Sequence, residues 1–96
     1  MLAARTERVE TYVGACRLSL SNRLAGLRCV LRVYQDFLGD TPTLRHADGG
    51  FGSLSNGDAA FAMLQCQPLE LELEDGRKWS ISITDLQGSF VARPVG

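Results

Sequence analysis

Residues 68–85 read PLELELEDGRKWSISITD, two runs of alternating apolar and polar residues on either side of an Asp-Gly pair. Successive side chains of a strand point to opposite faces, so the leucines of the first run lie on one face and its glutamates on the other. In the second run Trp79, Ile81 and Ile83 form a matching apolar row. The stretch therefore predicts a β-hairpin with one buried and one solvated face.

The length of the turn decides which residues of this hairpin face each other. A two-residue turn at Asp75-Gly76 sets Leu73 opposite Lys78 and mixes the apolar and polar faces. A three-residue loop over residues 74–76, with Gly76 in the left-handed conformation, keeps the faces apart. The predicted pairs are Leu71 with Trp79, Leu69 with Ile81 and Glu72 with Lys78. A further strand is expected over residues 89–93.

The N-terminal third of the chain also alternates. Residues 11–21, TYVGACRLSLS, and residues 27–34, LRCVLRVY, each carry an apolar row, and their β-branched and aromatic residues favour strands. A loop of even length between them predicts the pairs Leu18 with Cys29 and Cys16 with Leu31. The alternative is a helical segment over residues 17–38 packed on a C-terminal β-meander, because apolar residues there also recur at intervals of three and four.

Residues 39–57, GDTPTLRHADGGFGSLSNG, are rich in turn-forming residues and show neither period, which predicts a long glycine-rich loop. Ser55 and Asp58 have the spacing of a helix cap, so a short helix is expected over residues 58–65. The predicted fold is an α+β domain, mainly antiparallel β, of order ββ-loop-α-βββ, with a small barrel-like or half-open sheet and one short helix. The predicted core is Tyr12, Cys16, Leu18, Leu20, Leu27, Leu31, Val33, Phe61, Leu64, Leu69, Leu71, Trp79, Ile81, Ile83 and Phe90.

Length and composition limit the number of domains and the class of protein. The chain has 96 residues, an apolar fraction of 45% and a net charge of −1, which predict a single globular domain over residues 1–96. The longest apolar run is far too short for a membrane span and no secretory leader is visible, so a cytoplasmic location without membrane association is expected. Three cysteines without a close pair fit a reducing compartment. The preference for Arg over Lys indicates a GC-rich, bacterial source.

Three candidate reactive sites have simpler structural explanations. Residues 48–58 precede the predicted helix, as a phosphate-binding loop would, but lack the Lys-Ser/Thr ending of a P-loop. Cys16, Cys29, Cys66 and His46 are zinc-ligand types without the closely spaced pairs of a structural zinc site. His46 also lies among serines, but nothing supplies a nucleophile elbow or an oxyanion hole. We therefore expect no catalytic residue, no metal, no cofactor and no enzymatic activity.

The basic residues form the strongest candidate binding surface. On a strand hairpin, Arg17, Arg28 and Arg32 share the outer face with Tyr34, and Arg23 lies near the turn. Arginines interleaved with an aromatic side chain on a sheet are typical of surfaces that bind single-stranded nucleic acid. The structural explanation is a solvated face whose arginines pair with the chain's own acids. Arg17, Arg28, Arg32 and Tyr34 are the predicted binding residues.

The function predicted from these features is a small non-enzymatic protein-interaction or assembly module. It binds a protein partner or a second copy of itself through the unpaired edges expected in a short sheet. A small domain gains stability from association, which favours a homodimer. The alternative is a small nucleic-acid-binding β domain that uses the arginine face.

Overall fold

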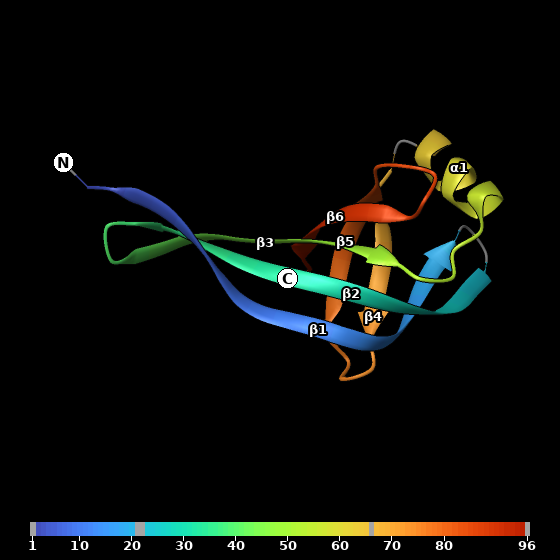
Figure 1. Cartoon of the computed structure of the whole chain (residues 1–96), viewed down its shortest axis with the longest axis horizontal. Coiled ribbons are helices and arrows are strands. Elements are labelled where there is room, and N and C mark those ends of the chain that lie inside the picture. The colour runs from blue at the N-terminus through green and yellow to red at the C-terminus, as the bar shows by residue number, and fades with distance from the viewer. Residues whose placement is uncertain (1, 21–22, 66, 96) are drawn as a thin grey trace.

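Six antiparallel strands close into a barrel in the order β1-β2-β3-β6-β5-β4, with β4 returning to β1 (Figure 1). The computed structural model describes residues 2–20, 23–65 and 67–95, and of Arg23 only the backbone. The strands in this part of the chain are β1 (Ala4–Leu20), β2 (Arg23–Leu38), β3 (Thr41–Phe51), β4 (Leu69–Leu73), β5 (Lys78–Ile83) and β6 (Ser89–Pro94). Two meanders, β1-β2-β3 and β4-β5-β6, are therefore joined along two seams, β1 with β4 and β3 with β6.

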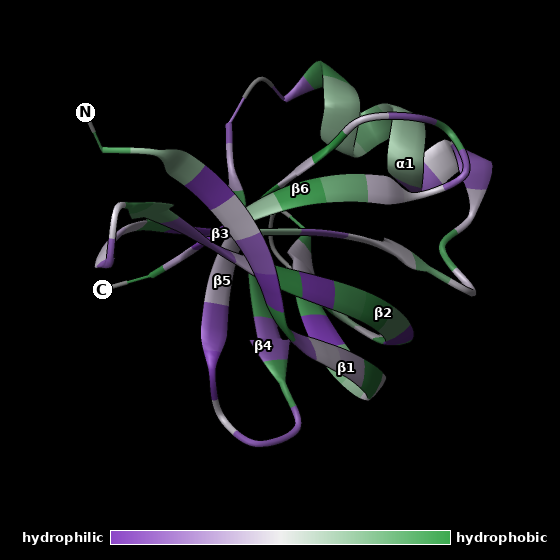
Figure 2. Ribbon diagram, turned by 60° about the vertical axis from the view of Figure 1, so that its left-hand side comes forward, coloured by the Kyte–Doolittle hydropathy of each residue, from purple (hydrophilic) through white to green (hydrophobic). Residues whose placement is uncertain are grey.

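The inward-facing residues of all six strands fill the barrel. Figure 2 shows hydrophobic and hydrophilic residues alternating along the strands, as expected where one side faces the core and the other faces water. The buried apolar residues are Cys16, Leu18, Leu20, Cys29, Leu31, Val33, Ala47, Phe51, Ala59, Ala62, Leu69, Leu71, Leu73, Trp79, Ile81, Ile83, Phe90 and Ala92. Enclosing a large apolar side chain contributes about 1.5–3 kcal/mol, so this core is the main source of stability.

The first three strands run on past the barrel. Residues 4–8 of β1, 34–38 of β2 and 41–46 of β3 form a three-stranded ribbon, called the arm below. The arm extends to the left in Figure 1 and gives the molecule extents of 47 × 27 × 22 Å. Arg5 braces it, because its guanidinium lies 4.4 Å from the centroid of the Phe37 ring and donates to the Gly39 carbonyl at 2.6 Å. The arm therefore has side-chain contacts of its own.

Helix α1 (Asn56–Leu64) lies at the end of the barrel away from the β4–β5 turn (Figure 1). Ser55 caps it, since its hydroxyl oxygen accepts from the Asp58 amide at 3.1 Å. Ala59 and Ala62 face the barrel and are buried, whereas Phe61 and Leu64, both predicted as core residues, are exposed. The small side chains, and not the large ones, therefore seat the helix. No helix in the described ranges is long and apolar enough to cross a membrane.

Two predictions about the architecture are wrong. The sheet is a closed barrel and not a half-open α+β sheet, because β1 pairs with β4 on one side and β3 with β6 on the other. The helical alternative over residues 17–38 is also wrong, because β1 and β2 pair along their length. Leu24 and Leu38 are two of the apolar residues that recur at intervals of three and four in this segment, and both are exposed on the strands. The three-and-four spacing therefore does not mark one buried face.

The predicted loop over residues 39–57 is wrong as well, because Thr41–Phe51 forms β3. Half of this strand lies in the arm, where it has no core to face. Its exposed half therefore lacks the apolar alternation that identifies a strand in sequence. The other half is built from Ala47, Gly49, Gly50 and Phe51, of which the two glycines resemble a turn in sequence.

The two predicted hairpin registers have different outcomes. The C-terminal register is confirmed, with Leu71 opposite Trp79, Leu69 opposite Ile81, Glu72 opposite Lys78 and Gly76 at a φ of 91°. The N-terminal register is wrong by four residues, since Cys16 lies opposite Leu27 and Leu18 opposite Ala25. Leu20 already pairs with Arg23, so the connection is tighter than the prediction assumed. Because the loop is still even, each residue keeps its predicted face.

Candidate functional site

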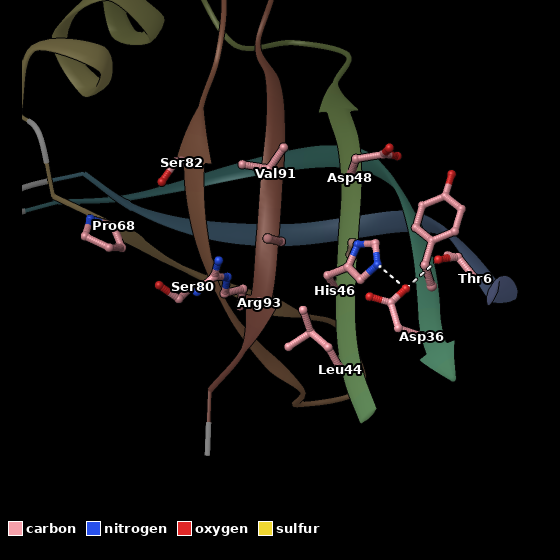
Figure 3. Close-up of a pocket in the computed structure, with 13 residues that line it drawn as sticks. Thr6, Asp36, Leu44, His46, Asp48, Pro68, Ser80, Ser82, Val91 and Arg93 are labelled. Atoms are coloured by element: carbon pink, nitrogen blue, oxygen red, sulfur yellow. Dashed lines mark hydrogen bonds and ion pairs between the residues drawn. The ribbon is translucent and has the colours of Figure 1, made fainter. Parts of the chain in front are cut away.

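An open groove of about 760 Å³ crosses the outer surface of the sheet at the base of the arm (Figure 3). Tyr34 lies opposite His46 and Ser82 opposite Val91 in neighbouring strands, so each pair shares one face of the sheet. The buried core residues Ala47 and Ala92 also border the groove. The residues that line it include Thr6, Tyr34, Asp36, Leu44 and His46 from the arm and Asp48, Ser80, Ser82, Val91 and Arg93 from the barrel. The groove therefore joins the arm to the outer wall of the barrel.

A hydrogen-bonded cluster occupies the arm side of the groove. The Thr6 hydroxyl donates to Asp36 Oδ1 at 2.6 Å, and His46 Nε2 donates to the same oxygen at 3.1 Å. The Tyr34 ring stacks on His46 with centroids 5.5 Å apart. The hydrogen bond from Thr6, followed by that from His46, holds the pKa of Asp36 below its usual value.

The order of groups in this cluster decides what chemistry it can support. In a nucleophilic triad the imidazole lies between the hydroxyl and the carboxylate, so that it can take the hydroxyl proton. Here the Asp36 carboxylate lies between the Thr6 hydroxyl and the His46 ring. The arrangement orients the ring of His46 and does not activate Thr6.

The four predicted binding residues share the outer face of β1 and β2, as the sequence predicts. Two of the arginines are engaged within the chain: Arg32 Nε donates to Asp48 Oδ1 at 2.7 Å, and Arg17 pairs with Glu72. Arg28 makes no ion pair with any described residue. It lines a second hollow, of about 360 Å³, beside Val13 and Val30. The Arg23 side chain lies outside the described part of the chain.

The structure separates the described residues of the zinc-ligand types considered above. Cys16 and Cys29 are free thiols inside the barrel, whereas His46 lies on the outer face. A hydrogen bond with Cys29, together with burial, raises the pKa of the Cys16 thiol, so it stays protonated. Cys66 lies outside the described residues. Among the residues that are described, no cluster of three metal-ligand side chains occurs.

The glycine-rich segment, considered above as a candidate phosphate loop, is largely part of a strand. Gly49, Gly50 and Phe51 belong to β3 and pair with β2, so the ladder takes up their backbone groups. At the start of α1, Ser55 already accepts from an amide, and the acidic Asp58 occupies the first turn. This helix end therefore has little to attract an anion.

Strand edges provide a further candidate surface. Barrel closure removes most free edges, and among the described residues the unpaired edges include the arm and the part of β1 between the arm and Cys16. On β3 the edge is irregular: the ladder with β2 shifts between Gln35 and Phe37, Pro42 lacks an amide hydrogen, and the Leu44 carbonyl accepts from Gln35. On β1, Ala4–Arg8 pair continuously with β2. The pairing of β1 with β4 covers only Cys16, Arg17 and Leu18, so Ala4–Arg8 have no strand partner on that side.

The sequence did not point to the groove or the arm, because both depend on β3. Thr41 and Thr43, two β-branched residues in an otherwise loop-like stretch, were the available signal for a strand. They are too few to outweigh the surrounding glycines, aspartates and proline. Comparison with protein-family models, curated proteins and solved structures finds no match to this chain.

Proposed function

We propose that this protein is a non-enzymatic assembly module that binds another polypeptide by strand addition at the open edge of β1 in the arm. The observation that carries the proposal is the continuous run from Ala4 to Arg8, which is paired on its β2 side alone. An exposed edge of this kind offers a row of backbone donors and acceptors to an extended segment of a partner.

The ladder with β2 indicates which backbone groups are available. The Gly39 amide donates to the Ala3 carbonyl at 2.8 Å. Backbone groups of an antiparallel strand point to alternate sides, so those of Arg5 and Glu7 also face β2. The backbone amide and carbonyl groups of Ala4, Thr6 and Arg8 then point away from β2, toward the side on which a partner strand would pair.

Side-chain contacts hold the open edge in its extended form. Arg5 is fixed by Phe37 and Gly39, and Thr6 is fixed by its 2.6 Å hydrogen bond to Asp36. A partner strand therefore meets a backbone that is already ordered, which reduces the entropy that binding costs. The edge of β3, with its bulge and Pro42, lacks this regularity.

Replacing Thr6 with Pro tests the proposal. The change removes one outward amide donor and leaves the amides that pair with β2 in place. We expect a displayed library of extended peptides to yield binders of the wild-type protein that fail to bind Thr6→Pro. Thr6→Val is the matched control, because it loses the hydroxyl but keeps the amide, and should retain those binders. Peptides that bind all three proteins equally would contradict the proposal.

The arginine face is a second candidate surface, for single-stranded nucleic acid. It is favoured by the stacked Tyr34–His46 pair, by Arg28 of this face and by Arg93 of β6, which lines the groove beside that pair. Neither arginine makes an ion pair with a described residue. The ion pairs of Arg17 and Arg32 weigh against it.

An oligonucleotide titration at several salt concentrations tests this second candidate. Binding through phosphates should weaken steeply as salt rises and should be lost in Arg28→Glu/Arg93→Glu. Arg5→Glu removes a positive charge on the opposite face of the arm from Tyr34 and should have little effect. Absence of binding at low salt, or binding that ignores salt, would exclude the arginine face as a nucleic-acid site.

A further inference from the structure

We propose that the partner strand is β1 of a second copy of this chain, paired antiparallel about a two-fold axis at Thr6. This inference rests on the strand-addition function proposed above and names its partner. It follows from the charges along the open edge, where Arg5 and Glu7 lie on one face and Thr6 and Arg8 on the other.

Charge selects one of three neighbouring registers. A two-fold axis at Arg5 places Arg5 opposite its own copy, and an axis at Glu7 does the same for Glu7. Like charges directly opposite each other destabilise a strand pair. An axis at Thr6 instead places Arg5 of each copy opposite Glu7 of the other. Two opposite-charge pairs then flank a neutral centre, so the edge is complementary to itself in this register alone.

The backbone agrees with this register. Thr6 carries outward-facing backbone groups, so the two copies of Thr6 form a hydrogen-bonded pair at the axis. Ala4 of one copy lies opposite Arg8 of the other, and both have outward groups as well. The resulting sheet has six strands, with β1 of each copy at its centre.

The shape of the molecule leaves room for the second copy. In an antiparallel pair centred on Thr6, the two β1 strands run toward the axis from opposite directions. The barrel-forming part of β1, which pairs with β4 at Cys16–Leu18, therefore lies at opposite ends of the paired arms. The exposed apolar side chains of Leu2 and Val9 lie at the two ends of the paired segment, 64% and 47% exposed.

The dimer should be weak and dependent on concentration, because five residues from each copy bury less area than a standard stable interface. Sedimentation at high micromolar concentration is therefore the appropriate measurement. The wild-type protein should show a monomer–dimer equilibrium. Arg5→Glu and Glu7→Arg should each raise the dimer dissociation constant about tenfold, because each change sets like charges opposite each other twice. Arg8→Glu is the matched control on the same strand and should have little effect, since Arg8 faces Ala4.

Mixing the two charge variants provides the decisive test. The Arg5→Glu protein has two acidic residues on this face and the Glu7→Arg protein has two basic ones, so the mixed dimer restores both attractive pairs. We expect the mixture to form heterodimers at least as tight as the wild-type dimer. A mixture that stays monomeric, or a wild-type dimer that none of these changes affects, would overturn the inference.

A designed disulfide checks the register without relying on charge. In a Cys66→Ser background, Thr6→Cys places its new thiol opposite its own copy, at the Cα separation of about 5.5 Å that a disulfide accepts. Mild oxidation should link Thr6→Cys to itself, and should link Ala4→Cys to Arg8→Cys only in a mixture. Self-linking of Ala4→Cys or Arg8→Cys would overturn the Thr6 register. If the wild-type protein is monomeric yet peptides still select the edge as described above, the self-pairing fails and strand addition stands.

Discussion

At the scale of single residues, Gly49 is the described glycine with the least room for a side chain. A Cβ atom added to Gly49 would lie 1.9 Å from the Val30 carbonyl oxygen and 3.0 Å from the Phe90 ring. At the next residue, Gly50, the nearest atom to an added Cβ is 4.0 Å away. Adjacent glycines in one strand therefore have different roles, since only the first allows β2 and β3 to approach closely.

Replacing Gly49 with Ala should destabilise the protein by about 3 kcal/mol, because the clash is with backbone and no side chain can rotate away. Gly50→Ala should be neutral or slightly stabilising, since Ala suits a strand better than Gly where there is space. Urea unfolding of both variants measures the difference. Equal midpoints for the two would show that β2 and β3 do not approach each other this closely at Gly49.

Residue faces were predictable in the strands whose sequences alternate between apolar and polar residues. Leu69, Leu71, Trp79 and Ile81 alternate with polar residues, and their burial is confirmed. The exposure of Phe61 could not be predicted in this way, because hydropathy alone suggests that it is buried. The face of α1 that contacts the barrel is set by the space available there, which accommodates alanine.

At the scale of elements, the β4–β5 turn is tied to β1 by an ion pair. Arg77 Nη1 and Nη2 donate to the two carboxylate oxygens of Glu10 at 2.7 and 2.6 Å, and Arg77 Nε donates to Asp75. The hydrogen bonds from Arg77 hold the pKa of Glu10 below its ordinary value of 4.5. This contact bridges a span of β1, before Cys16, that has no strand partner on that side.

Replacing Glu10 with Gln should lower stability near neutral pH by about 0.5–1 kcal/mol, a modest value because both side chains are over a third exposed. A carboxylate with a depressed folded-state pKa stabilises the protein above its unfolded-state pKa and loses that contribution as pH falls through the folded value. The difference in free energy of unfolding between the wild-type protein and Glu10→Gln should therefore become smaller as pH is lowered below 4.5.

Urea midpoints across this pH range measure the effect. Glu70→Gln is the control, because Lys78 Nζ lies 3.7 Å from Glu70 in a pair about half exposed, and its loss should change little. If Glu10→Gln lowers stability by the same amount in acid as at neutral pH, the ionised Glu10–Arg77 pair is not the cause of the loss.

Elements differ in how well their sequences predict them. The β4–β5 hairpin was predictable with its register, because two alternating runs and one glycine determine it locally. β3 was not, because its outer half borders no core and the glycine pair of its inner half lies in the strand, where Gly49 allows close packing, and not in a turn. The arm and the groove could not be inferred without that strand.

At the scale of the whole molecule, local sequence patterns could not predict that the barrel closes. Closure depends on β1 meeting β4 and β3 meeting β6, contacts between segments with no shared periodic signal. The arm also makes the molecule longer than a compact chain of its length, with a radius of gyration of 14.2 Å against about 12.5 Å expected. The four predicted binding residues nevertheless lie on one outer face. The connection between β1 and β2 has an even number of residues, as predicted, so each residue keeps its predicted face although the register differs.

The two seams that close the barrel also have a consequence for how fast the protein folds. Each meander forms from neighbours in sequence, but the pair Arg17 and Glu72, on the β1–β4 seam, is separated by 55 residues. Contacts of such range slow folding, and domains dominated by them fold in milliseconds to seconds. During synthesis, β1 also has to wait for β4 to emerge from the ribosome. Until then, the N-terminal meander exposes edges that the finished barrel conceals.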